Sequence, residues 1–400
     1  MRITDILLRQ FARDLEGIHA ARLRLVFTAT CALLRAGKIS LTSIGRTIAV
    51  RTTQKHGIKR VDRLLGNQRL WDELQAFYKA IARRLIPEGS RPVIVVDWTS
   101  LSATMWTLTA AVSFEGRALA IYSESHPISR YAKPAVHRAF LRGLREILPQ
   151  QCVPIIVTDA GFRSPWMKEV SALGWDYVCR LRGINKLRKV GTTGWRTLRS
   201  FFLDVTRREK DFGAYQVGRL IRHTTRIVGY RKRGSWLRLG QQHEKSSKRW
   251  WRRESRRTKK RRAAREPWVL ATSLPSSPQK VVAHYRCRMQ IEQTFRDNKN
   301  SRFGFSLAEA RTRTARRADV LTLLANLAHL TTTLAGLIAE QRHLDRGYQA
   351  NTLRTRRVFS LSRLGRLLLA TGESRRLDFR DVNAAWEHLR TRLAPLLEAS

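Results

Sequence analysis

One short stretch of the chain carries four side chains that suit phosphate chemistry. They stand at positions i, i+3, i+7 and i+14 and are Tyr285, Arg288, Glu292 and Lys299. At about 100° per residue, these offsets predict one α-helix with all four on the same side. Arg288 and Lys299 can hold phosphates there, and Tyr285 can hydrogen-bond a phosphate oxygen. Glu292 can bind a metal ion.

A plainer interpretation of this stretch stays open. Arg288, Glu292 and Arg296 have the i,i+4 spacing of salt bridges on a solvated helix. That interpretation explains the Arg–Glu–Arg spacing, but it gives no reason for Tyr285 and Lys299 on the same side.

Two further acids follow strand-like segments. Asp97 ends the β-branched run VIVVD, and Asp159 follows PIIVT. Mg²⁺ prefers oxygen ligands, and two such ions a few ångströms apart can stabilise both the attacking and the leaving oxygen of an in-line displacement. We therefore expect Asp97, Asp159 and Glu292 to share one two-metal site. The alternative is that these Asp residues have no catalytic role, because an Asp at a strand end is common in α/β proteins.

The charge of the chain indicates a polyanionic partner. Its 400 residues include 77 Lys and Arg against 31 Asp and Glu, a net charge of +46. Such an excess opposes compact folding unless a polyanion neutralises it. Nucleic acid is the usual partner of this kind, and an anionic membrane is the competing one. The 43% of hydrophobic residues is enough for packed cores, which excludes a disordered basic tail.

The cysteines, the N-terminus and the most apolar segment limit the class of protein and the cellular compartment that the sequence predicts. The cysteines form no CxxC pair, so neither a zinc site nor a disulfide framework is expected: Cys31, Cys152, Cys179 and Cys287. The N-terminus predicts no signal peptide. The most apolar window, Val320 to Ala339, contains Asn326 and His329 and therefore predicts a buried helix rather than a membrane span. These features favour a reduced cytosol.

The order of the elements predicts a mixed α/β protein. Residues 1–90 indicate short helices with clustered basic residues, which favours a helical DNA-binding domain; a solvated basic helix face is the alternative. Residues 91–305 interleave apolar strands with helices, as a catalytic domain would. Within them, residues 183–266 predict a β-rich insertion with a basic arm at 245–265. Residues 306–400 predict a helical C-terminal domain.

Two details of the catalytic domain are predicted more closely. Met105–Phe114 and Ala118–Ser123 are separated by Glu115-Gly116, as the strands of a hairpin would be. A helix is expected from Pro134 to Leu148.

The string Tyr-x2-Arg-x3-Glu-x6-Lys resembles the signature of the family-four insertion-sequence transposases, which are bacterial DDE cut-and-paste enzymes. That family includes the transposases of composite transposons ten and five. Further blocks resemble the family in the same order: IKRVDRLLGN, VVDWTSL, VTDAGFRSPW, EPWVLATSLP and RMQIEQTFRD. The set is most similar to the transposon-ten branch, and it covers most of the chain.

The resemblance implies an RNase H-like mixed-sheet core with a β-rich insertion, flanked by N-terminal and C-terminal helical domains. It implies that Asp97, Asp159 and Glu292 bind two Mg²⁺ or Mn²⁺ ions per active site. The reaction would be a nick at the transposon end, a hairpin, hairpin opening and strand transfer into target DNA. The partner would be double-stranded DNA, bound at terminal inverted repeats by a homodimer at the bacterial nucleoid in the cytoplasm. Neither a membrane nor a small-molecule substrate is expected.

Two more residues acquire roles only through the resemblance. Trp268 matches a family tryptophan on which a flipped base stacks; the alternative is a core tryptophan at the start of a strand. Arg63 matches a position that touches the transposon end. Two other functions stay open: an RNase H-like nuclease that cuts DNA without joining it, and a non-catalytic DNA-binding relic.

Overall fold

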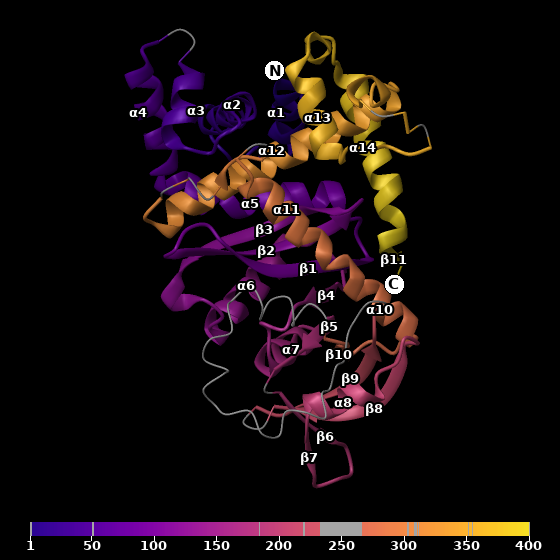
Figure 1. The fold of residues 1–400 in the computed structure, drawn as a ribbon. Coiled ribbons are helices and arrows are strands. Elements are labelled where there is room, and N and C mark those ends of the chain that lie inside the picture. The colour runs from indigo at the N-terminus through magenta and orange to yellow at the C-terminus, as the bar shows by residue number, and fades with distance from the viewer. Residues whose placement is uncertain are drawn as a thin grey trace, which may run out of the picture. The chain divides into compact units, whose positions relative to one another are not determined.

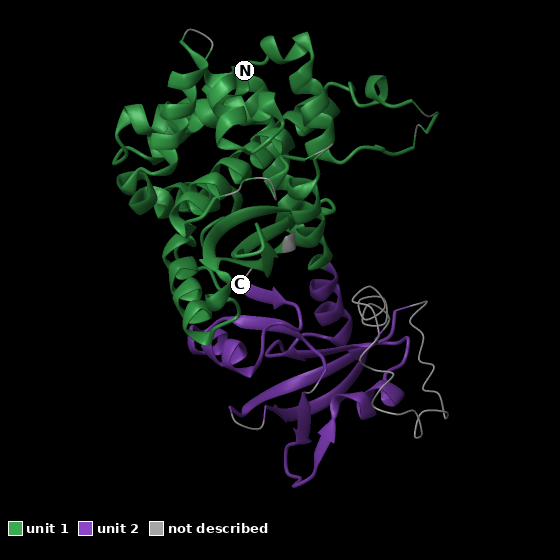
Figure 2. Ribbon diagram, turned by 60° about the vertical axis from the view of Figure 1, so that its left-hand side comes forward, with its two compact units in different colours: residues 1–154, 287–400 green, residues 155–286 purple. Residues whose placement is uncertain are grey.

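The computed structural model describes residues 2–49, 52–183, 185–218, 221–232, 266–301, 304–307, 310, 312–350, 352–353 and 355–399. The chain divides into two compact units (Figure 2). The first consists of Met1–Pro154 with Cys287–Ser400, and the second of Ile155–Arg286. These bounds differ from the expected domain bounds at residues 90 and 305, and the domain division itself stays a prediction.

The first unit opens with a run of amphipathic helices, as the sequence predicts for this stretch. They are α1 (Arg2–Asp14), α2 (Ala20–Ala36), α3 (Leu41–Ile48), α4 (Gln54–Leu65) and α5 (Gln68–Leu85). Local sequence sets their ends. Gly37 stops α2 in the left-handed conformation with φ 64°, and the Ser40 hydroxyl accepts the Ser43 amide to cap α3. The α3 and α4 backbones touch, because a Cβ on Gly57 would lie 2.2 Å from the Gly45 carbonyl oxygen.

Antiparallel strands follow in the first unit. They are β1 (Ser90–Ser100), β2 (Met105–Phe114) and β3 (Arg117–Pro127), in the order β3-β2-β1. The predicted hairpin around Glu115-Gly116 is confirmed. A further strand, β11 (Leu397–Ala399), pairs with the start of β1, with Ser90 opposite Ala399. The C-terminal stretch is therefore not helical throughout, because its last residues extend the sheet.

Helices complete the first unit. They are α6 (Pro134–Ile147), α11 (Met289–Lys299), α12 (Ala315–Gln341), α13 (Leu361–Ala370) and α14 (Phe379–Leu393), with short 3₁₀ turns at Ile128–Arg130, Arg346–Tyr348, Gly372–Arg375 and Ala394–Leu396. In Figure 1, α12 runs through the helical layer that the N-terminal helices share with α13 and α14. Among the described residues, α12 is the one helix long and apolar enough to cross a membrane, and 94% of its most apolar window is buried. The buried helix predicted there is confirmed.

The second unit is built on a mixed sheet. Its strands are β4 (Ile155–Thr158), β5 (Asp176–Leu181), β6 (Lys186–Lys189), β7 (Trp195–Thr197), β8 (Lys210–Val217), β9 (His223–Tyr230) and β10 (Trp268–Thr272). Their order is β4-β5-β10-β9-β8-β6-β7. The β4–β5 pair is parallel, with α7 (Ser164–Ala172) between the strands, and β10 pairs antiparallel with both β5 and β9. The α/β class is confirmed.

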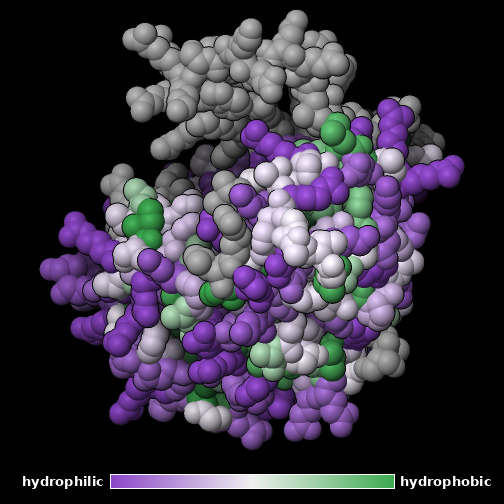
Figure 3. Space-filling view, turned by 90° about the horizontal axis from the view of Figure 1, so that it is seen from below, coloured by the Kyte–Doolittle hydropathy of each residue, from purple (hydrophilic) through white to green (hydrophobic). Residues whose placement is uncertain are grey.

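The insertion is β-rich where the structure describes it. The described residues between 183 and 266 form β6, β7, β8 and β9 and one short helix, α8 (Leu198–Asp204). The basic arm at 245–265 lies outside the described residues. On the face of the molecule drawn in Figure 3, hydrophilic side chains predominate and hydrophobic ones occur in small groups, as the high charge predicts.

Candidate active site

The signature stretch forms two helices rather than one. α10 (Pro278–Cys287) carries Tyr285 and ends before Arg288, and α11 begins at Met289. The expectation of one helix with all four side chains on the same side is therefore wrong. A tertiary contact accompanies the break, because the Ser113 hydroxyl donates a 3.2 Å hydrogen bond to the Cys287 carbonyl. A side-chain hydrogen bond to this carbonyl competes with the backbone hydrogen bonds that would continue the helix.

Arg288 joins two of the predicted acids. Its Nη1 atom lies 2.7 Å from Glu292 Oε1 and 3.7 Å from Asp97 Oδ2. The Arg288 side chain is 10% exposed and the Asp97 side chain 13%, so this is a partly buried cluster rather than a solvated surface pair. The structure thus brings Asp97 and Glu292 to one guanidinium, although 195 residues separate them in the sequence (292 − 97).

Lys299 extends this cluster along α11. Its Nζ lies 3.3 Å from the hydroxyl oxygen of Ser100, the last residue of β1. At about 100° per residue, Arg288, Glu292 and Lys299 share one side of α11. This side therefore runs along the C-terminal half of β1, where it presents one carboxylate and two cations beside Asp97. Ser100 is thus a further candidate site residue, which no sequence pattern indicates.

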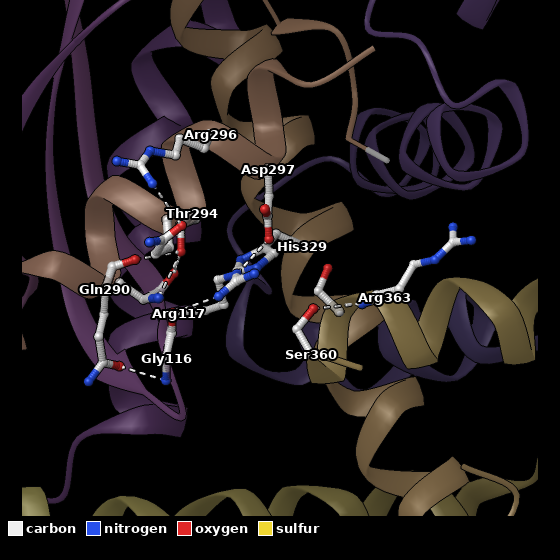
Figure 4. A network of polar contacts seen from close by, with 12 residues as sticks. Gly116, Arg117, Gln290, Thr294, Arg296, Asp297, His329, Ser360 and Arg363 are labelled. Carbon is white, nitrogen blue, oxygen red and sulfur yellow. Dashed lines mark hydrogen bonds and ion pairs between the residues drawn. The ribbon is translucent and has the colours of Figure 1, made fainter. Parts of the chain in front are cut away.

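The other side of α11 holds the helix in place. Gln290 Oε1 accepts the Gly116 amide at 3.1 Å, and Asp297 pairs with Arg117 at 2.5 Å (Figure 4). Between them, the Thr294 hydroxyl accepts the Ala118 amide at 2.8 Å and lies 3.2 Å from the Ala118 carbonyl. These contacts fasten α11 to the turn between β2 and β3. No sequence pattern predicts these contacts, because none of the three helical side chains stands out by residue type.

The strand that carries Asp97 is held along one edge by β2 and on one face by α6. Asp97 pairs with Thr109 of β2, and its Oδ1 accepts the Trp98 amide at 2.8 Å. Trp98 points to the opposite face, where its indole donates a 3.1 Å hydrogen bond to His137 Nε2 of α6. Burial, with a contribution from nearby His126, lowers the pKa of His137 to about 4, so this ring stays a neutral acceptor.

Asp159 lies in the second unit, directly after β4. Its Oδ1 accepts the Gly161 amide at 2.7 Å, which shapes the turn after the strand. Its convergence with Asp97 and Glu292 stays a prediction. Within the part of the chain that the structure describes, no group of three or more His, Cys, Asp or Glu side chains is arranged to hold a metal ion.

Trp268 and Tyr285 pack on each other inside the second unit. Their ring centroids are 4.7 Å apart at an interplanar angle of 76°, and Tyr285 is 2% exposed. Burial lowers the pKa of the neighbouring Arg180, while Tyr285 opposes that shift. Arg180 is another residue that the sequence analysis missed. An arginine inside the apolar run WDYVCRLR was the available signal.

Arg63 is exposed on α4 of the first unit. The same helix exposes three other cations, Lys55, Lys59 and Arg60. The spacing of α4 thus gathers basic side chains on its solvent side, and its apolar residues Val61, Leu64 and Leu65 face the core.

The α/β fold, the large positive charge and the carboxylate–guanidinium cluster fit an enzyme class that acts on nucleic-acid phosphodiesters. The family model of the transposase DDE domain matches residues 88–329, which is 242 of 400 residues (329 − 88 + 1), so the chain belongs to that family. The match includes every candidate site residue except Arg63. No curated protein matches the chain. DNA is the partner that the family implies, and divalent metal ions are its general cofactors.

Proposed function

We propose that this protein is the transposase of a bacterial family-four insertion sequence, most similar to the transposon-ten branch. It binds the terminal inverted repeats of its element as a homodimer at the nucleoid in the cytoplasm. It excises the element by nick, hairpin and hairpin opening, and it joins the freed 3′ ends to target DNA. The observation that carries the proposal is the partly buried cluster in which Arg288 faces both Asp97 and Glu292.

The donor atoms of this cluster fit a hard divalent ion. Asp97 and Glu292 offer carboxylate oxygens, which are the ligands that Mg²⁺ and Mn²⁺ take in phosphoryl-transfer sites, and we propose Asp159 as the third acid. Two bound Mg²⁺ or Mn²⁺ ions would supply the charge that stabilises the attacking and leaving oxygens of each displacement. Hydrolysis and transesterification need the same support, so one site serves every step.

The remaining residues hold DNA in this proposal. Arg288 and Lys299 bind phosphates beside the acids, Arg288 as a planar fork and Lys299 as a point charge. Tyr285 hydrogen-bonds a phosphate oxygen, which requires its buried hydroxyl to become accessible when DNA binds. Trp268 stacks on a flipped base, and Arg63 contacts the transposon end. Residues 1–90 bind end DNA, and residues 306–400 serve dimerisation and DNA contact.

The acids are tested by Asp97→Asn, Asp159→Asn and Glu292→Gln. Each variant is expected to abolish Mg²⁺-dependent cleavage of end DNA while binding stays within about threefold of the wild type. The DNA substrate carries the end sequences of the element. These are identified as inverted repeats in the genomic DNA on either side of the coding region. Glu373→Gln is the control, because Glu373 lies in an exposed pair with Arg376 in the first unit. Cleavage that survives in one acid variant removes that acid from the site.

A strand-transfer assay separates the proposal from its alternatives. A nuclease without joining activity would need the same acids but would give no joined product from pre-cut ends. A non-catalytic relic would show neither cleavage nor joining in the wild type. Carboxylates at all three positions argue against the relic.

A further inference from the structure

Two glutamates and two arginines of the first unit form a closed ring of ion pairs. Arg357 lies 2.8 Å from Glu115 and 3.0 Å from Glu340. Arg392 lies 2.7 Å from Glu115 and 2.8 Å from Glu340. The four side chains are 16–30% exposed. Each one faces two opposite charges, so the ring is held more firmly than an isolated surface pair.

The ring connects parts of the chain that are far apart in sequence. Glu115 lies in the turn between β2 and β3, and Glu340 in the last turn of α12. Arg357 lies in the segment before α13, and Arg392 in the last turn of α14. The ring thus fastens one hairpin turn to the C-terminal helices.

The backbone at Glu115 is unusual for its residue type. Its φ is 46°, followed by 81° at Gly116, in a two-residue loop between paired strands. Positive φ at both loop residues matches the twist of a tight hairpin, but Asn, Asp or Gly usually occupies the first position. A glutamate in this conformation is strained, because its Cβ approaches the following carbonyl oxygen. Its ion pairs with two arginines offset this strain and give a physical reason for a glutamate at this position.

The residues directly after Glu115 hold α11. Gly116 donates to Gln290, Arg117 pairs with Asp297, and Ala118 exchanges hydrogen bonds with Thr294 (Figure 4). The same tight turn therefore contacts the ring of ion pairs through Glu115 and contacts α11, the helix of Glu292, through residues 116–118. Since a two-residue loop has little internal freedom, a change in the ring reaches α11 directly.

We propose that the ring of Glu115, Arg357, Glu340 and Arg392 positions α11, and with it Arg288 and Glu292, relative to Asp97. The four ring residues act as positioning residues: their ion pairs are with one another, and they set the helix that carries the candidate cluster. The relevance of this role for catalysis rests on the proposed function, whereas the structural role does not.

Hydrogen–deuterium exchange on the full chain tests the structural role. In Glu115→Gln, the amides of residues 289–299 are expected to exchange about tenfold faster than in the wild type, while those of α12 and of β5 in the second unit keep their rates. Glu340→Gln leaves the turn sequence intact and is expected to do the same. Glu387→Gln is the control. Glu387 lies in α14, as Arg392 of the ring does, but it forms an exposed pair with Arg390 outside the ring. Unchanged α11 rates overturn the proposal, and so does equal acceleration in α12.

Rescue at Arg392 gives a second readout. Arg392→Lys keeps the positive charge between the two glutamates and is expected to recover most of the α11 protection, whereas Arg392→Met is not. On end DNA, Arg392→Met is expected to lower the cleavage rate about tenfold with DNA affinity unchanged, because the helix is displaced and the DNA-binding helices are not. Equal loss in both Arg392 variants contradicts the charge-based mechanism. If the wild type cleaves no DNA, the proposed function fails, and the exchange measurement still decides the positioning role.

Discussion

Arg288 and Glu292 form an i,i+4 ion pair of 2.7 Å across the start of α11. The spacing alone predicts this pair, and it leaves a solvated helix surface open as the alternative to an active site. In the structure Arg288 is 10% exposed and also faces Asp97, so the pair does not lie on a solvated helix surface, and its role in an active site stays a prediction. Arg296, the third member of the expected salt-bridge series, donates instead to Gln293 at 3.4 Å.

Arg288→Ala is expected to destabilise the first unit by about 1–3 kcal/mol, because it leaves Asp97 and Glu292 without the cation that lies between them. Mg²⁺ is expected to recover more stability in this variant than in the wild type, since a divalent ion can compensate both carboxylates. Thermal unfolding with and without Mg²⁺ measures the difference. Arg296→Ala is the control on the same helix. An equal response to Mg²⁺ in the wild type and in Arg288→Ala would contradict the expectation that the ion compensates both carboxylates when Arg288 is absent.

Trp268→Ala is expected to slow hairpin formation more than the first nick, because base–aromatic stacking worth roughly 1–3 kcal/mol offsets the cost of unstacking the terminal base. Trp268→Phe keeps an aromatic ring for stacking. Its rate of hairpin formation is expected to lie between those of the wild type and Trp268→Ala. Single-turnover gels that resolve nicked and hairpin products give both rates. Trp195→Ala serves as control, because Trp195 stacks under Arg188 at the edge of the same unit. If both steps slow equally, Trp268 acts through its packing on Tyr285.

His137→Gln is expected to flatten the dependence of stability on pH between about 6.5 and 4. In the folded protein the pKa of His137 is lowered from 6.5 to about 4. Between these pH values the unfolded chain therefore binds a proton at this residue that the folded chain does not bind. Folding stability is therefore lost as pH falls, by up to ~3 kcal/mol. Gln keeps an acceptor for the Trp98 indole and does not titrate.

Urea unfolding at pH 7 and pH 5 measures the slope for His137→Gln. Burial raises the pKa of Asp319 to about 6, which contributes the opposite slope, so the difference between variant and wild type is the quantity to compare. His56→Gln, at an exposed position on α4, is the control. A variant curve as steep as the wild-type curve contradicts the assignment.

Gly365→Ala is expected to destabilise the first unit by ~2–4 kcal/mol, because the added Cβ would lie 1.8 Å from the Thr332 carbonyl oxygen where α13 crosses α12. Gly372→Ala, a few residues further on, has no described atom other than those of its chain neighbours within 4 Å of the added Cβ, and it is expected to change stability by less than about 0.5 kcal/mol. Urea unfolding of both variants measures the contrast. A small loss in Gly365→Ala would mean that the two helices can separate without cost.

The sequence predicts those parts of the fold that local pattern determines. The runs ending at Asp97 and preceding Asp159 are β1 and β4, and the Glu115-Gly116 pair marks the hairpin, because apolar runs and turn residues carry that information. The break before α11 was not predicted, since it coincides with a contact from Ser113 that no periodicity reveals. β11 was missed for a similar reason: three residues are too few for a pattern.

The candidate site was predictable by residue type and not by connection. Motif spacing identifies Arg288, Glu292 and Lys299. It does not reveal that Arg288 reaches Asp97 or that Lys299 reaches Ser100, because both contacts depend on how α11 lies on β1. Asp159 and its relation to the other acids stay a prediction.

The pairing of β1 with β11 sets an order of events during synthesis. Ser90 finds its partner only when residue 399 has left the ribosome, roughly three hundred residues later, whereas Ile155–Arg286 is one continuous stretch that can close on itself as soon as it emerges. A nascent polypeptide thus already displays much of its basic surface while the strand of Asp97 still lacks this edge. Translation halted before the last helix would release a product that carries positive charge and lacks both β11 and the Arg392 corner of the ring.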